Sequence, residues 1–426
     1  MKISFITLGC KVNAYESDAI MNMFKARGEL IVDTNTPSDV VIINTCSVTN
    51  QASAKSRKLI RSAIRNNPGA IIAVLGCYSQ MSKDEVASIP GVSIVIGNAN
   101  KSAVVDLVYR EKEKRELVVK VEDILHHKEF EELSPIEFSH TRAFLKIEDG
   151  CNNFCSYCII PFTRGPVRCK NADKVIEDVS NIVNNGYQEI VLTGIHTGRY
   201  NDQGVTFTAI VKRILNETKL ARLRISSIEL NEVTDEFLTL MKNNSVIARH
   251  LHIPLQAGSN HVLKMMRRHY TREEFIDRIK YIKEYIPDIS ITTDIIVGFP
   301  EETEEDFLET LDLARTVGFA KIHCFPFSLR AGTKACEYKE VSDNVKNLRM
   351  EKLMALDKEL VEAHQNKYLD TECDIIIEDQ HDDYLVGHSS NFLTVYVPYQ
   401  KNMSGAFVHV KIKSLKGGKL YGEYFK

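Results

Sequence analysis

The feature that most constrains the fold is a repeated alternation of β-rich and helical segments between Arg142 and Arg330. The β-rich segments are short and apolar, and the segments between them have the apolar spacing of amphipathic helices. Strands that alternate with helices form a parallel sheet, and six such units in succession predict a barrel or partial barrel with active residues at the carboxyl ends of its strands. The expected strands are residues 143–147, 189–192, 222–226, 250–255, 291–297 and 321–325.

Two further regions flank this alternation. Residues 1–110 contain β-rich runs separated by helical segments, which predicts a second α/β unit with a parallel sheet. After a long helical segment, five short β-rich runs with glycine-containing turns predict a small OB-like β-barrel. We therefore expect an α/β protein with an N-terminal parallel-sheet domain at 1–112, a charged linker at 113–140, a partial (β/α)6 barrel at 141–368 and a small β-barrel at 369–426.

Composition and charge exclude several classes of protein. The 426 residues include ten cysteines and carry a formal net charge of −3, which excludes a disulfide-rich secreted domain and a uniformly basic nucleic-acid binder. The sequence contains no apolar run long enough to span a bilayer, and its first residues lack the regions of a signal peptide. We therefore expect a cytoplasmic protein, without a membrane partner, whose clustered thiols bind metal in a reducing compartment.

The strongest chemical signal is the motif Cys151-Asn-Asn-Phe-Cys155-Ser-Tyr-Cys158, which directly follows the first expected barrel strand. Three thiolates on one short loop can hold three irons of a [4Fe–4S] cluster and leave the fourth iron open for S-adenosylmethionine (SAM). The alternative is a zinc knuckle, but a closed zinc site uses four ligands and the motif supplies three. The position after a barrel strand favours the cluster.

Cys10, Cys46 and Cys77 form a second set. Each follows the carboxyl end of an expected N-terminal strand, at the edge where open parallel sheets bind ligands. The alternative for each cysteine taken alone is a buried apolar role, because cysteine is often buried. Their shared position at strand ends favours ligation of a metal.

Segments along the whole chain resemble the methylthiotransferase family of the radical SAM superfamily. The segments occur in the family's order, and the C-terminal barrel is similar to a TRAM domain, a small tRNA-binding module, although its acidic stretch 378–383 departs from basic character. The matching motifs are Thr7-Leu-Gly-Cys-Lys-Val-Asn13, Asn44-Thr-Cys-Ser-Val-Thr49, Leu75-Gly-Cys77, Gly150-Cys-Asn-Asn-Phe-Cys-Ser-Tyr-Cys-Ile-Ile-Pro-Phe-Thr-Arg-Gly165, Thr193-Gly-Ile-His-Thr-Gly198, Arg224-Ile-Ser-Ser-Ile-Glu229, His252-Ile-Pro-Leu-Gln-Ala-Gly-Ser259 and Asp294-Ile-Ile-Val-Gly-Phe-Pro300.

The resemblance implies a transferase with two [4Fe–4S] clusters and SAM as cofactors. The motif cysteines would hold the radical SAM cluster, and the second cysteine set would hold an auxiliary cluster that carries sulfur. A radical formed from SAM would remove hydrogen from C2 of an adenine, and a methylthio group would then be attached there. Because this C–H is not acidic, the cofactors carry the step and no catalytic residue is expected beyond the cluster ligands. The implied partners are tRNA and a reductant protein such as flavodoxin or ferredoxin.

The resemblance also assigns contact residues. SAM is expected to meet residues of the cysteine loop and the strand ends, namely Tyr157, Thr193, Gly194, Glu229, Gln256 and Val297. The alternative for each is a packing or turn residue of the barrel rim. Lys11, Arg164 and Arg168 flank the two cysteine loops, and we expect them to contact an anionic substituent of the substrate. His252 is interpreted as a structural histidine.

Local basic patches are candidates for RNA contact. Lys58, Arg61 and Arg65 share one helical face, and Arg267-Arg268-His269-Tyr270 follows the fourth expected barrel strand. The alternative for any such patch is ordinary solvated surface.

The opening motif and Gly165-Pro-Val-Arg168 resemble the family branch that acts on N6-threonylcarbamoyladenosine (t6A). The implied function is conversion of t6A at tRNA position 37 to 2-methylthio-t6A. The alternatives are methylthiolation of N6-isopentenyladenosine in tRNA and then of ribosomal protein S12. A protein of another class, a non-catalytic iron–sulfur RNA-binding redox protein, would need neither an open iron nor a barrel that binds SAM.

Overall fold

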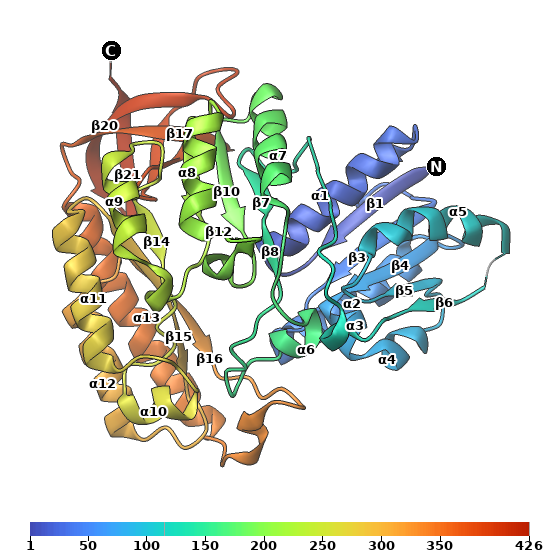
Figure 1. Ribbon diagram of the computed structural model, residues 1–426, viewed down its shortest axis with the longest axis horizontal. Coiled ribbons are helices and arrows are strands. Elements are labelled where there is room, and N and C mark those ends of the chain that lie inside the picture. Colours follow the sequence, from blue (N-terminus) through green and yellow to red (C-terminus); the bar gives the residue numbers. More distant parts are fainter. Residues whose placement is uncertain (115, 426) are drawn as a thin grey trace.

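The computed structural model describes residues 1–114 and 116–425, and the chain forms three regions in succession (Figure 1). An N-terminal parallel sheet, a central half-barrel and a C-terminal closed barrel follow one another, coloured from blue through green and yellow to red. The expected α/β architecture is confirmed. Within the described part of the chain, no helix combines the length and the apolar character that a bilayer crossing requires.

The N-terminal sheet consists of six parallel strands. In spatial order they are β2 (Leu30–Ile31), β1 (Lys2–Thr7), β3 (Val40–Thr45), β4 (Ile71–Gly76), β5 (Ile94–Ile96) and β6 (Val118–Lys120). β3 is buried along its whole length, as expected for a central strand that is covered on both faces. β6 pairs with β5, so the sheet continues past the expected boundary at residue 112 and into the charged segment.

Helices cover both faces of this sheet. α1 (Lys11–Ala26) and α5 (Val104–Lys114) pack on one face, and α2 (Asn50–Asn66), α3 (Cys77–Met81) and α4 (Lys83–Ala87) pack on the other. The helical pattern of the sequence covers residues 16–27, whereas α1 begins at Lys11, directly after its N-cap residue Cys10. α2 starts at a conventional cap, since the Thr49 side chain accepts a hydrogen bond from the backbone N–H of Ala52 at 3.1 Å.

The central region is an open half-barrel of parallel strands. They are β7 (Ala143–Lys146), β10 (Glu189–Thr193), β13 (Arg222–Ile225), β14 (His250–His252), β15 (Ser290–Val297) and β16 (Lys321–Pro326). The strands pair in chain order within two three-stranded sheets, and a parallel bridge between Leu223 and Ile247 joins the two sheets. All six lie where the alternation of the sequence places them.

The helices between these strands cover the outer face of the half-barrel. They are α7 (Ala172–Asn184), α8 (Phe207–Glu217), α9 (Asp235–Asn243), α10 (Asn260–Met265), α11 (Arg272–Tyr285) and α12 (Glu304–Val317), and α13 (Asp343–Asn366) follows β16. Capping boxes at Thr271 and Thr303 fix the starts of α11 and α12. Tyr15 and Ala19 of α1 belong to the half-barrel core, so this N-terminal helix packs against the central region as well as its own sheet.

The C-terminal region is a closed barrel of five strands: β17 (Glu372–His381), β18 (Tyr384–Ser389), β19 (Thr394–Pro398), β20 (Phe407–Lys416) and β21 (Lys419–Tyr424). It is fixed to the half-barrel by Arg224, which donates to the carbonyl oxygen of Ser389 at 3.0 Å. Glu378, the first residue of the acidic stretch, pairs with Arg142 at 2.9 Å and with His388 at 2.8 Å. This acidic side chain therefore serves the interface between the two barrels.

Candidate active site

The cysteine motif lies on the loop that follows β8 (Glu148–Asp149), at the carboxyl end of β7. Gly150 begins the loop with φ of 94°, in the region that favours glycine. The loop is held by backbone hydrogen bonds from Cys151 to Gly165 and from Cys158 to Cys155, each 3.0 Å long. The thiols of Cys151, Cys155 and Cys158, here called the barrel triad, line one cavity.

Cys10, Cys46 and Cys77, here called the N-terminal triad, meet at the carboxyl edge of the N-terminal sheet. They follow β1, β3 and β4, which are neighbours in that sheet. A Cβ atom at Gly9 would lie 3.2 Å from Cys46 Sγ, and Gly9 has φ of 104°. Glycine at this position therefore allows the loops of Cys10 and Cys46 to approach each other.

The number and kind of ligands in each triad indicate which metal group fits. All six cysteines are free thiols, which is the form that can bind metal. A closed zinc site uses four ligands, and each triad supplies three. Three thiolates can hold three irons of a [4Fe–4S] cluster, so the donor set of each triad fits an iron–sulfur cluster better than a single structural ion.

Burial keeps two of these thiols neutral before metal binds. It raises the pKa of Cys158 to about 12 and the pKa of Cys46 to about 11. A metal must therefore displace protons from the triads when it binds, because thiolate is the ligand form.

One cavity of about 450 Å³ reaches both triads. Its wall contains Cys10 from the N-terminal region and the whole barrel triad from the central region. This volume lies in the range of small-molecule sites. A larger cavity of about 530 Å³ is lined by residues such as Arg199 and Glu236, and no cysteine is among the described residues of its wall. The chemistry of the lining, rather than the volume, therefore identifies the site.

Five of the six expected SAM contacts line the 450 Å³ cavity, namely Tyr157, Thr193, Gly194, Glu229 and Gln256. The side chain of Val297 is fully buried, and Asp294 and Ile296 are the β15 residues in the cavity wall. Successive residues of a strand face opposite sides, so Ile296 in the wall turns Val297 toward the covering helices. The side chain of Val297 thus lies outside the cavity, contrary to the expectation.

Glu148 supports the turn at Thr193 and Gly194 and was not expected from the sequence. Its carboxylate accepts hydrogen bonds from the backbone N–H groups of Ile195 at 2.9 Å and His196 at 2.6 Å. A Cβ atom at Gly194 would lie 2.6 Å from Glu148 Oε2, so this close approach requires glycine. Burial raises the pKa of Glu148 to about 8.

Two further residues beside the barrel triad were missed. Arg268 Nη1 lies 3.7 Å from Cys155 Sγ and 3.1 Å from Glu229 Oε1. His196 Nδ1 lies 3.6 Å from Cys151 Sγ. Donors next to sulfur ligands offset the negative charge of an iron–sulfur cluster. In the sequence, Arg268 was recognised only as part of a basic patch. Its partner Glu229 lies 39 residues earlier in the chain, so the sequence does not indicate the pair.

Arg164 and Arg168 do not reach the substrate side of the site. The Arg164 guanidinium is 0% exposed and donates to Asp149 at 2.9 Å, to Glu16 at 3.1 Å and to Asn13 at 2.7 Å. Arg168 is also buried, and it donates to the carbonyl oxygen of Arg164 at 2.7 Å. The expectation that both contact substrate is therefore wrong. Their network instead connects α1 to the loop that carries the barrel triad.

Lys11 is the expected substrate contact that faces the cavity. The side chain of Lys11 is exposed to solvent. The surrounding protein and the positive charge of Arg142 lower the pKa of Lys11.

Two protein families match parts of this chain. Residues 145–314 match the radical SAM superfamily, and residues 2–97 match the uncharacterized protein family UPF0004. The chain superposes on the radical S-adenosylmethionine methyltransferase TsrM from Kitasatospora setae with a TM-score of 0.58, at 14% identity and over 78% of this chain and 76% of that one. This likeness shows the fold alone.

Relatives that align along most of the chain identify its family. The chain is 42% identical to threonylcarbamoyladenosine tRNA methylthiotransferase MtaB of Bacillus subtilis (strain 168), over 99% of this chain and 95% of that protein. It is 37% identical to the protein of the same name from Aquifex aeolicus (strain VF5), over 87% and 92% of the two chains. It is 32% identical to tRNA-2-methylthio-N(6)-dimethylallyladenosine synthase of Clostridium botulinum (strain Langeland / NCTC 10281 / Type F), over 98% and 95%. The chain therefore belongs to the methylthiotransferase family of radical SAM enzymes, as its motifs indicated.

Proposed function

We propose that this transferase attaches a methylthio group to C2 of t6A at position 37 of tRNA and forms 2-methylthio-t6A. The observation that carries the proposal is the single cavity that reaches Cys10 on one side and the barrel triad on the other. Joining a sulfur group to a carbon that a radical has activated requires that both groups reach the same base. A relative named for t6A is 42% identical over 95% of its length, and others with that name are 32–37% identical, whereas a relative named for dimethylallyladenosine is 32% identical.

Membership of the radical SAM superfamily implies SAM and a [4Fe–4S] cluster. The barrel triad would hold this cluster, which together with SAM supplies the radical needed to break an unactivated C–H bond. We infer a second cluster at the N-terminal triad. The support is three free thiols that follow neighbouring strands at one sheet edge, one ligand fewer than a closed zinc site uses.

The chain's own residues bind, orient and exclude water. Thr193 and Gly194 would hold the amino-acid part of SAM at the carboxyl end of β10, in the turn that Glu148 supports. Apolar side chains such as Ile296 and Phe327 form other parts of the cavity wall. A wall of this kind keeps water away from reactive intermediates.

The tRNA would contact basic residues that remain accessible. Lys58, Arg61 and Arg65 of α2 are exposed, so the expected RNA surface is available there. The start of α2 is tied to the wall of the cavity, because the backbone N–H of Asn50 donates a hydrogen bond at 3.0 Å to Oγ of Ser328, which lines the cavity. We propose the closed C-terminal barrel as a second RNA surface, a cytoplasmic location with the tRNA, and flavodoxin or ferredoxin as electron donor.

The test supplies the reconstituted enzyme with tRNAs that differ only at position 37, carrying t6A, isopentenyladenosine or adenosine. Nucleoside mass spectrometry measures the methylthio product, and 5′-deoxyadenosine reports SAM cleavage. We expect product on t6A. Product only on isopentenyladenosine would refute t6A as the substrate, and SAM cleavage without product on any of the three tRNAs would point to a substrate of another kind, such as ribosomal protein S12. Absence of 5′-deoxyadenosine under reducing, anaerobic conditions would favour a non-catalytic iron–sulfur protein.

A further inference from the structure

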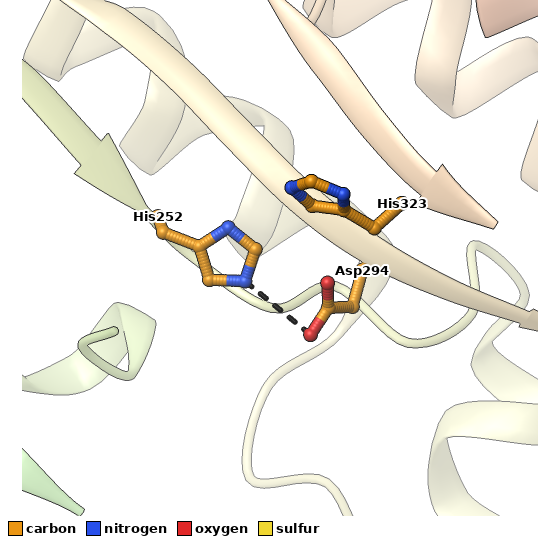
Figure 2. A group of neighbouring side chains, drawn as sticks. All are labelled: His252, Asp294 and His323. Atoms are coloured by element: carbon orange, nitrogen blue, oxygen red, sulfur yellow. Dashed lines mark ion pairs between the residues drawn. The ribbon is translucent and has the colours of Figure 1, made fainter. Parts of the chain in front are cut away.

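Three polar side chains from consecutive strands meet on the inner face of the half-barrel (Figure 2). His252 is on β14, Asp294 on β15 and His323 on β16. Asp294 and His323 are direct partners across the two strands, and His252 pairs with Thr292, one side-chain row before Asp294. One possible ligand atom from each of the three lies within 4.8 Å of the others.

Two of these groups are held in place. His252 Nδ1 lies 3.0 Å from Thr292 Oγ1, and His252 Nε2 lies 3.3 Å from Asp294 Oδ2. His323 differs, because the hydrogen bonds and ion pairs among the described residues include none to its ring. Its side chain is exposed, and its ring centroid lies 5.6 Å from that of His252. The ring of His323 is therefore available to a ligand.

This group of side chains adjoins the shared cavity. Asp294 and Phe325 are both part of the cavity wall. Phe325 is 42% exposed and follows His323 by one side-chain row on the same face of β16. An exposed aromatic ring in such a cavity offers a stacking surface for a base that has left its helix. Lys11 faces the same cavity from the N-terminal region.

The arrangement fits the chemistry of one modified base. Successive rows on one face of a strand are roughly 6.6 Å apart, comparable with the reach of an N6 substituent beyond the adenine ring. The threonylcarbamoyl group carries urea N–H groups, a hydroxyl and a carboxylate, whereas an isopentenyl group is a hydrocarbon. Asp294 can accept from an N–H or hydroxyl, and His323 can donate to the carboxylate. An isopentenyl group would offer no hydrogen-bond partner to His323 and no donor to Asp294, and sites built for polar substituents reject such analogues strongly.

We propose that Asp294 and His323 read the N6 substituent of t6A while Phe325 stacks on its adenine. His252 is then a positioning residue, because it acts through its contact with Asp294. The inference rests on the proposed function and deepens it by naming the residues that set substrate choice.

The test measures RNA binding by the holoenzyme under anaerobic conditions. Fluorescently labelled anticodon stem-loops carry either t6A or adenosine at position 37, and the variants are His323→Ala and His323→Gln. We expect His323→Ala to weaken binding of the t6A stem-loop about 10- to 100-fold and to leave binding of the adenosine stem-loop unchanged. His323→Gln keeps a donor and should recover part of the loss. His126→Ala is the matched control, because its side chain is 86% exposed outside the cavity.

Several outcomes would overturn the inference. Equal weakening on both stem-loops would give His323 a general structural or RNA-binding role. A stoichiometric metal ion beyond the cluster iron, lost in His323→Ala, would make the three residues a metal site. A wild-type enzyme that forms product on isopentenyladenosine and none on t6A would refute the proposed function together with the inference. Product on t6A, with unchanged discrimination by His323→Ala, would refute the inference alone.

Discussion

Replacing Arg164 by methionine tests whether its buried network holds the two cysteine triads in their working arrangement. Methionine keeps a long apolar side chain and removes the charge and its donors. Arg164, Glu16, Asn13 and Asp149 are each at most 3% exposed. The substitution therefore leaves buried polar groups that water cannot easily reach.

The loss of stability can be estimated from the contacts that remain. Removing one partner from a buried ion network costs about 3–5 kcal/mol, because an uncompensated charge stays buried. Lys146 still contacts Glu16 at 3.2 Å and Asp149 at 3.3 Å, and Lys101 also contacts Glu16. Both carboxylates thus keep a partner, and we expect the lower end of that range, about 3 kcal/mol.

The effect on the reaction should be selective. Asn13 donates to the carbonyl oxygens of Leu8 at 2.6 Å and Thr45 at 3.1 Å, which lie within two residues of Cys10 and Cys46 in the chain. Loss of the Arg164 donor should therefore shift the N-terminal triad relative to the barrel triad. Because a misplacement of about 1 Å can cost on the order of 100-fold in rate, methylthiolation should fall much more than 5′-deoxyadenosine formation.

Two measurements check this prediction. Urea unfolding of the apoprotein gives the stability change, and mass spectrometry of both products gives the ratio of the two reactions. Arg213→Met is the control, because Arg213 forms ion pairs at the surface with Glu217 and Asp173. We expect its stability and product ratio to match the wild type. An unchanged urea midpoint in Arg164→Met, or an equal loss of both products, would refute the reasoning.

Three other predictions concern the clusters, a glycine and pH. Alanine at all three positions of the N-terminal triad should remove about half of the iron and spare 5′-deoxyadenosine formation, whereas the same change in the barrel triad should abolish it; full iron content in the first variant would exclude a second cluster. Gly76→Ala should lower the Tm and the iron content, because its Cβ would lie 2.6 Å from Asn44 Oδ1 and 2.7 Å from the Thr45 carbonyl oxygen at φ of 100°; an unaltered Tm would contradict this. Burial and neighbouring lysines lower the pKa of His364 to about 4. The unfolded chain therefore takes up a proton below pH 6.5 that the folded chain does not, and stability should fall by about 2 kcal/mol between pH 7 and pH 5. His364→Gln should lack this fall, and equal pH dependence of the two proteins in urea unfolding would count against it.

The elements of the fold were predictable because their signals are local. Apolar periodicity and turn residues located all six strands of the half-barrel and the five strands of the closed barrel. β6 lies in the segment that was predicted as a charged linker at 113–140, because a short edge strand among charged residues carries little apolar pattern. The start of α1 was missed because Cys10 caps the helix without a side-chain hydrogen bond.

The candidate site was less predictable, because the residues that contact one another there are distant in sequence. Arg164 and Arg168 lie in a polar segment that reads as a surface loop in the sequence. Their burial follows from ion pairs with Glu16 and Asp149, which the sequence alone does not reveal. Val297 was assigned to the cavity from a motif, whereas the two-residue alternation of β15 decides which side chains face inward. His323 is a lone histidine in the sequence, and it becomes a candidate only when β16 places it beside Asp294.

α1 contacts the shared cavity, Arg164 and the cores of both the half-barrel and the N-terminal region. Its first residue, Lys11, and its cap, Cys10, lie in the wall of the shared cavity. Residues spaced three or four apart face the same side of a helix, so Glu16 and Asn13 both meet Arg164. Tyr15 packs in the half-barrel core, and further along the helix Phe24 packs against the N-terminal sheet. One rigid helix thus sets the position of a proposed cluster ligand relative to the barrel triad, and a shift of that helix would move Cys10 and Lys11 together.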